Sequence, residues 1–95
     1  MKLHPKTDRI MRKVGDDIRT WRLAQRLTAT SVADRAGITR VTLRAIERNP
    51  GTASFENVMS VLAVLGLDEA VGAAVDPTLS IRGQTILTAA ARKEI

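Results

Sequence analysis

The sequence predicts an all-α fold: a bundle of five helices, followed by a C-terminal tail that can add a short helix. The 95 residues are 44% hydrophobic but only 2% aromatic, so any core must be aliphatic and rich in alanine. Such a composition favours packed helices over strands. Apolar residues also recur at helical spacing, and Ser, Thr, Gly and Pro stand where the helices are expected to begin and end.

The first helix is expected over residues 6–25, with Thr7 or Asp8 capping its start. Gly15 weakens its middle, and the residues before it are expected to be loose, with His4 solvated. Its apolar side chains follow a spacing close to i, i+4, i+7, at Ile10, Val14, Ile18 and Trp21. This stripe predicts that Trp21 belongs to the core.

Two short helices separated by a tight turn follow. Thr28 is expected to cap a helix that runs to Ala36, and Gly37 suits the left-handed residue that ends it. Thr39 then caps a helix over residues 40–48, which Asn49-Pro50-Gly51 terminates. The residues expected to face inward are Val32, Ala33, Leu43 and Ile46.

The fourth helix is expected from its cap Ser54 to Leu65, and Gly66 ends it. Asp68 precedes a short fifth helix over residues 69–75, and an alanine-rich helix is expected over residues 85–94 after a break at Gly83. The inner face of the fourth helix is Val58, Val61, Leu62 and Leu65. The chain therefore divides into a basic N-terminal arm that includes the start of the first helix (1–13), a helical domain (14–76) and a tail (77–95).

Charge is unevenly distributed along the chain. Residues 1–48 hold 12 Lys/Arg against 5 Asp/Glu, a net charge of +7, and residues 49–95 hold 3 against 5, a net charge of −2. One basic half suggests a side that faces a polyanion. The basic N-terminal run has two readings, a DNA-following arm or a solvated end: Lys2, Lys6, Arg9, Arg12 and Lys13.

Several functions are excluded on composition. The absence of cysteine rules out disulfides and cysteine-ligated zinc and fits a reducing cytoplasm. No apolar run approaches the roughly 18 residues that span a bilayer. With one histidine there is no catalytic Ser/His/Asp arrangement and no metal-ligand cluster, so no enzyme activity, metal or cofactor is expected.

The helix over residues 40–48 presents a basic outer face. Its outward positions are Arg40, Val41, Arg44, Ala45 and Arg48. Arginine forks match both guanine edges and phosphate, and a helix with such a face suits a DNA major groove. The remaining charge on this helix, Glu47, is expected to form an ion pair with Arg22 of the first helix, either partly buried or at the surface.

The stretches 14–22, 27–28, 32–40, 42–43 and 46–48 together resemble the phage repressor/Cro-type (XRE-like) helix-turn-helix domain, over about residues 14–75. The resemblance implies a five-helix repressor-like bundle that binds DNA as a two-fold dimer, with Arg22 and Glu47 as a structural ion pair. It places base-reading side chains at Arg40, Val41, Arg44 and Ala45. The full set expected to bind DNA is Thr28, Thr30, Thr39, Arg40, Val41, Thr42, Arg44, Ala45 and Arg48.

The chain departs from that family pattern at two positions. Ala29 stands where many members carry glutamine, which removes one phosphate clamp that Thr28 and Thr30 can partly replace. Arg26 stands where many carry glycine, at the end of the first helix.

The expected function is a sequence-specific transcriptional repressor on double-stranded DNA with a palindromic operator, acting as a homodimer in the bacterial cytoplasm at the nucleoid. Within this class the short single-domain chain is similar to the antitoxins of type II toxin–antitoxin operons, of the HipB type, which bind a toxin, often of the kinase type. The alternatives are a stand-alone phage-type or metabolic repressor, and a helical protein-interaction module without DNA binding.

Overall fold

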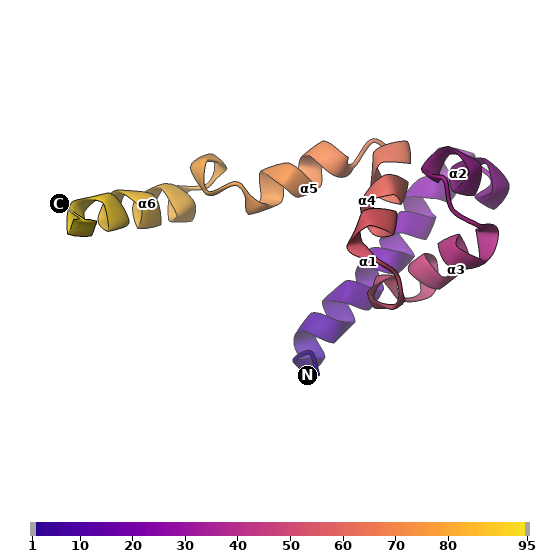
Figure 1. Ribbon diagram of the computed structural model, residues 1–95, viewed down its shortest axis with the longest axis horizontal. Coiled ribbons are helices and arrows are strands. Elements are labelled where there is room, and N and C mark those ends of the chain that lie inside the picture. The colour runs from indigo at the N-terminus through magenta and orange to yellow at the C-terminus, as the bar shows by residue number, and fades with distance from the viewer. Residues whose placement is uncertain (1, 95) are drawn as a thin grey trace.

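The computed structural model describes residues 2–94 and is all-α, with no strand in that range, as the composition predicted. Six α-helices and two short 3-10 helices follow one another along the chain (Figure 1). Their bounds are α1 Pro5–Ala24, α2 Ala29–Ala36, α3 Arg40–Arg48, η1 Pro50–Thr52, α4 Phe55–Val64, α5 Asp68–Val75, η2 Pro77–Leu79 and α6 Ile81–Glu94.

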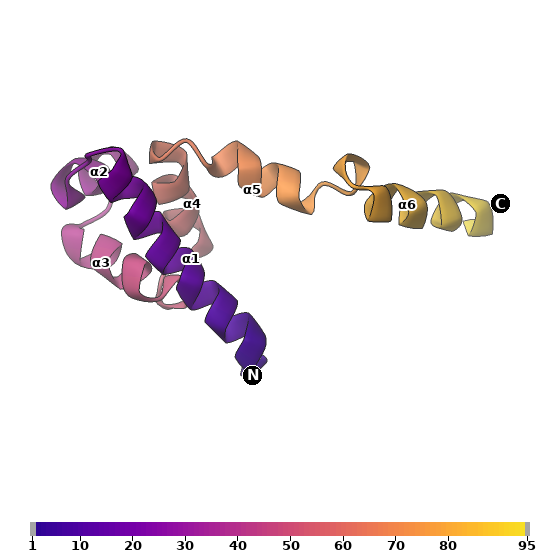
Figure 2. The ribbon, with the colours of Figure 1, turned by 180° about the vertical axis from the view of Figure 1, so that it is seen from behind.

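Helices α1 to α4 pack into one body, and α5 and α6 extend from it. Helix α1 lies across α3 and η1, while α2 packs on both α3 and α4 (Figure 2). Helix α5 packs on the end of α4 and borders α1 across a groove, and α6 packs on η2, so residues 68–94 form an arm that points away from the body (Figure 1). The all-α class, the five helices and the added tail helix are as predicted, but α5 extends from α1 to α4 rather than packing among them, which stretches the molecule to 54 × 29 × 21 Å.

The core is aliphatic, as the composition predicted. The buried apolar side chains are those expected on the inner faces of the helices, and the prediction of this set is confirmed: Ile18, Val32, Ala33, Leu43, Ile46, Val58, Val61, Leu62 and Leu65. All of them belong to the body, because the C-terminal arm contributes only the half-buried Val71 to the edge of this cluster.

The prediction that Trp21 belongs to the core is wrong. Most of the other side chains in the apolar stripe of α1 are not buried either. Only Ile18 of that stripe is buried, whereas Ile10 is 54% and Trp21 48% exposed. The helical spacing correctly placed these apolar side chains on one face of α1, but α5 turns away from that face. Helix α1 therefore keeps an apolar face that residues 2–94 cover only in part.

Most helix ends lie where their capping residues predicted. Thr28, Thr39 and Ser54 each accept a backbone N–H of the first turn of α2, α3 and α4, and Gly37 and Gly66 adopt φ of +71° and +81°. The start of α1 was predicted wrongly. His4 caps it rather than Thr7 or Asp8, because its Nδ1 accepts the Lys6 N–H at 3.1 Å and Pro5 fits the first helical position.

The last helices begin earlier than predicted. Helix α5 starts at Asp68 itself, with no side-chain cap, and α6 starts at Ile81 and runs through Gly83. A Cβ at Gly83 would lie 2.1 Å from the Pro77 carbonyl oxygen. The glycine that suggested a break is therefore a point of close contact between α6 and η2.

Candidate nucleic-acid interface

Helices α2 and α3 are joined by a tight turn that fixes one against the other. The Thr28 hydroxyl accepts the Ser31 N–H at 3.0 Å, and the Thr39 hydroxyl accepts the Thr42 N–H at 3.1 Å. Between them Gly37 takes the left-handed conformation that ends α2. Ala33, 1% exposed, is small enough to let the two helices cross closely.

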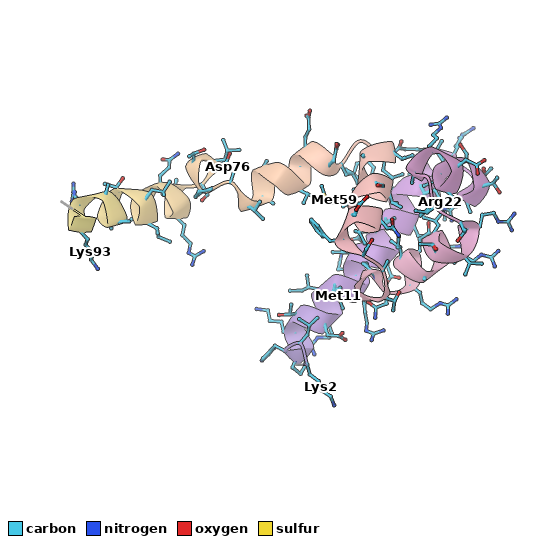
Figure 3. All side chains as sticks on the ribbon, in the orientation of Figure 1. Lys2, Met11, Arg22, Met59, Asp76 and Lys93 are labelled. Atoms are coloured by element: carbon cyan, nitrogen blue, oxygen red, sulfur yellow. The ribbon has the colours of Figure 1, made fainter. Side chains whose placement is uncertain are left out.

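Helix α3 has one buried and one exposed face. Leu43 and Ile46 are fully buried. On the other face Arg40, Arg44 and Arg48 are exposed at intervals of one turn, and Val41 is 78% exposed beside them. Two further predicted residues, Thr42 and Ala45, are half-buried at the edge of this face. Figure 3 shows nitrogen-tipped side chains projecting from α3 on the side away from the arm.

Three threonine hydroxyls lie beside this basic face. Thr28, Thr30 and Thr39 are exposed at or next to the starts of α2 and α3. The Arg40 guanidinium donates to the Thr30 hydroxyl at 3.4 Å, which connects the beginnings of the two helices. Helix N-termini favour anions because their first N–H groups lack partners within the helix. Hydroxyls and guanidiniums at these ends can therefore bind phosphate.

A buried ion pair connects α3 to α1, and Figure 3 labels its arginine, Arg22. Arg22 Nε donates to Glu47 Oε2 at 2.7 Å and its second terminal nitrogen to Oε1 at 3.2 Å. The first terminal nitrogen donates to the Leu27 carbonyl at 3.1 Å. The hydrogen bond with Glu47 raises the pKa of Arg22, although burial opposes the rise. The pair directs the carboxylate of α3 inward, so the outer face of α3 carries positive charge alone.

One basic residue of this surface was not predicted from the sequence. Arg19 of α1 lines, together with Arg44, Glu47 and Arg48, a shallow pocket of about 250 Å³ at the C-terminal end of α3. A signal was available, because Arg19 lies three residues before Arg22 and so shares its helix face. Once Arg22 was paired with Glu47, Arg19 had to lie over α3 as well.

The basic N-terminal run is partly neutralised within α1. Arg12 pairs with Asp8 at 2.9 Å and Lys13 with Asp17 at 2.7 Å, and all four side chains are largely exposed. Exposed pairs of this kind contribute little to stability. They lower the net charge that this end of α1 offers to a polyanion.

Neither a metal site nor a membrane span is found in the described part of the chain. Residues 2–94 contain no group of three His, Cys, Asp or Glu side chains that is able to hold a metal ion. None of their helices has the combined length and apolar character that crossing a bilayer needs.

Comparison with known proteins gives one match. A family model described as helix-turn-helix matches residues 18–71. The matched segment starts at Ile18 in α1, includes the whole of α2, the turn and α3, and ends in α5. No curated protein and no solved structure matches the chain significantly.

Proposed function

Because the chain belongs to the Cro/XRE-type helix-turn-helix family of DNA-binding transcription regulators, we propose that it is a sequence-specific repressor. Two copies related by a two-fold axis would each insert α3 into the major groove of a palindromic operator. The two half-sites would lie about 34 Å apart, one turn of the duplex. Such a regulator would work in the cytoplasm, at the nucleoid.

One observation carries this proposal: the outer face of α3 is exposed and carries three guanidiniums, while its single carboxylate is turned inward. Arg40 at the first turn and Arg44 one turn later are positioned for base edges, and Val41 for a thymine methyl group. Ala45, half-buried at the edge of this face, can offer a base edge only its methyl group. Phosphate contacts are assigned to the remaining predicted residues, Thr28, Thr30, Thr39, Thr42 and Arg48.

Selection from a pool of random-sequence duplexes tests the proposal. The full-length protein is expected to enrich a palindrome, and its affinity for that palindrome is expected to fall steeply as salt rises. The matched control is a variant with both Arg40→Ala and Arg44→Ala, which keeps Arg48 and the ion pair and should retain only weak, sequence-independent binding. Equal enrichment of all duplexes by the wild-type protein would refute sequence-specific repression and favour the interaction module without DNA binding.

The antitoxin of a type II toxin–antitoxin operon is the finer form of this proposal. It is supported by apolar side chains at the start of the tail, Leu79 at 66% and Ile81 at 85% exposed, which favour a protein partner. The partner would be a toxin, of the kinase type in the HipB-like case. Coexpression with the adjacent coding gene tests this proposal, which expects a complex of the two products. Recovery of the homodimer alone would favour a stand-alone phage-type or metabolic repressor.

A further inference from the structure

The chain exposes more surface than a compact protein of its size. Its accessible surface is 7224 Å², against about 5,400 Å² for a compact monomer of 95 residues. Its radius of gyration is 16.5 Å, against about 12.4 Å from the scaling of compact domains. The excess of about 1,800 Å² per chain is more than the roughly 800 Å² that each partner of a standard protein–protein interface buries.

The excess is concentrated in the C-terminal arm. Helix α6 has a small-to-apolar stripe at i, i+3, i+4 and i+7, formed by Gly83, Ile86, Leu87 and Ala90. Ile86 is 53% and Leu87 45% exposed, so this stripe has no adequate cover within its own chain. The opposite face of α6 is mainly polar and includes Gln84, Thr85, Thr88 and Arg92.

The junction between α5 and α6 fixes α6 against η2. Asp76 Oδ1 accepts the Thr78 N–H at 2.9 Å and the Thr78 hydroxyl at 2.7 Å, and these bonds lower the pKa of Asp76. Gln84 Nε2 donates to the Thr78 carbonyl at 2.8 Å, and Gly83 lies against Pro77. These contacts hold α6 and η2 together as one unit.

The body carries an apolar groove with room for apolar side chains of such a helix. This Trp21 groove has a volume of about 270 Å³ and is lined chiefly by Val14, Ile18 and Trp21 of α1 and by Leu67, Ala70 and Val71 at the start of the arm. Val14 also lines a second apolar groove of about 420 Å³, which reaches Phe55. This is the face of α1 whose apolar stripe lacks full cover.

The distribution of charge indicates which segment occupies the Trp21 groove. Residues 49–81, which supply α4, α5 and η2, contain four acidic residues and no Lys or Arg, a net charge of −4. Helix α6 holds three basic residues, Arg82, Arg92 and Lys93, against one acidic residue, Glu94, a net charge of +2. Helix α6 therefore complements the α4–α5 side of another copy in both apolar stripe and charge.

We propose that the protein is an arm-exchanged dimer, in which α6 of each copy lays its Ile86–Leu87–Ala90 stripe in the Trp21 groove of the other. This inference rests on the homodimer of the proposed function and specifies its contact surface. The exchange is reciprocal, so one two-fold axis closes the assembly and covers both grooves and both arms. Both α3 helices remain outside the contact, on the far side of each body (Figures 1 and 2).

Cross-linking between two differently tagged copies tests the exchange, since the chain has no cysteine of its own. One copy carries Leu87→Cys and the other Val14→Cys or, on the opposite wall of the groove, Ala70→Cys. Mild oxidation is expected to give a covalent heterodimer. The matched control, Thr88→Cys on the polar face of α6, is expected to give at least about tenfold less product at the same protein concentration.

Trp21 supplies a second, label-free measurement, because it is the only tryptophan and the chain has no tyrosine. Its emission is expected to shift to shorter wavelength as rising concentration assembles the dimer. Ile86→Asp with Leu87→Asp should raise the dimer Kd by more than about a hundredfold and abolish the shift. Thr85→Asp with Thr88→Asp, on the other face of the same helix, should preserve both.

The outcomes separate the exchange from the proposed function. A wild-type dimer that gives no Leu87 cross-link to either groove position overturns the exchange and leaves the two-fold repressor intact. An intramolecular cross-link in a chain carrying both cysteines overturns it in favour of self-docking. A wild-type protein that stays monomeric until the toxin covers α6 overturns it in favour of the antitoxin contact. The heterodimer cross-link together with the Trp21 shift supports it.

Discussion

Gly15 of α1 lies directly against the backbone of Glu47 in α3. A Cβ at Gly15 would be 2.7 Å from the carbonyl oxygens of both Glu47 and Ile46, and 3.0 Å from Cδ of Pro50. Helix α1 thus crosses the last turn of α3 at a distance that only glycine allows. This crossing brings Arg19 and Arg22, one and two turns further along α1, over the C-terminal half of α3.

Gly15→Ala should therefore destabilise the protein, although alanine is the better helix former. The obstructing atoms are backbone atoms that cannot rotate away, so the loss is expected to be about 1–3 kcal/mol. Urea unfolding followed by circular dichroism measures it. Gly72→Ala in α5 is the control, because no atom lies within 4 Å of its Cβ position. Equal stability of the two variants would contradict the close crossing.

Glu47→Ala should be the most destabilising single charge removal, because it leaves the Arg22 guanidinium buried without a counter-charge. The expected loss is about 3–5 kcal/mol, and the double variant Arg22→Met, Glu47→Leu should regain most of it. Asp17→Asn, which breaks the exposed pair with Lys13, should cost less than about 1 kcal/mol. Thermal melts of the wild-type protein and these three variants measure the losses. Similar melting temperatures for Glu47→Ala and Asp17→Asn would refute a structural role for the buried pair.

Arg26→Gly should stabilise the protein. Arg26 follows α1 with φ of +59°, the left-handed region that a side chain disfavours. Glycine relieves that strain in the folded state but also has greater freedom in the unfolded chain, which opposes the gain. The free energy of unfolding is expected to rise by up to about 1 kcal/mol. The midpoint of urea unfolding measures it, with Arg35→Gly inside α2 as the contrasting variant that should lose stability. A loss in both variants would show that Arg26 makes a contact that outweighs its strain.

Arg40→Ala should relax base preference at one position of each half-site. The expected loss on the preferred operator is about 1–3 kcal/mol, with much smaller changes on operators altered at that position. Titrations against a set of single-base operator variants measure this. A uniform loss across the set would assign Arg40 to phosphate.

Arg19→Ala should weaken binding to all duplexes alike. A guanidinium in the pocket beside Arg44 and Arg48 is placed for phosphate, so its removal should reduce the salt dependence of log K by about one unit of slope. Arg92→Ala on the polar face of α6 is the matched control and should leave that slope unchanged. An unaltered slope in Arg19→Ala would exclude Arg19 from the interface.

Local signals were enough to predict the helices around the interface. Thr28, Gly37 and Thr39 each act through hydrogen bonds or dihedral angles within a few residues, so the ends of α2 and α3 follow from the sequence. The core residues follow equally, because each helix has one apolar face and α1 to α4 supply enough such faces to bury one another.

The predictions that failed concern features that depend on contacts between distant segments of the chain. Periodicity places Trp21 on an apolar face but does not tell what covers that face, and the direction of α5 leaves it half exposed. Gly83 suggested a break because its contact with Pro77 is visible only in three dimensions. Arg19 acquires its place only through the crossing at Gly15, which no local pattern reports.

The separation of α3 from the C-terminal arm has a genetic consequence. In the proposed arm-exchanged dimer, a chain whose α3 arginines are replaced would keep an intact arm and groove, so it would still pair with normal chains. Each mixed pair would offer the operator one competent half instead of two. Alleles damaged in α3 are therefore expected to be dominant over the normal gene, whereas alleles damaged in α6 should be recessive.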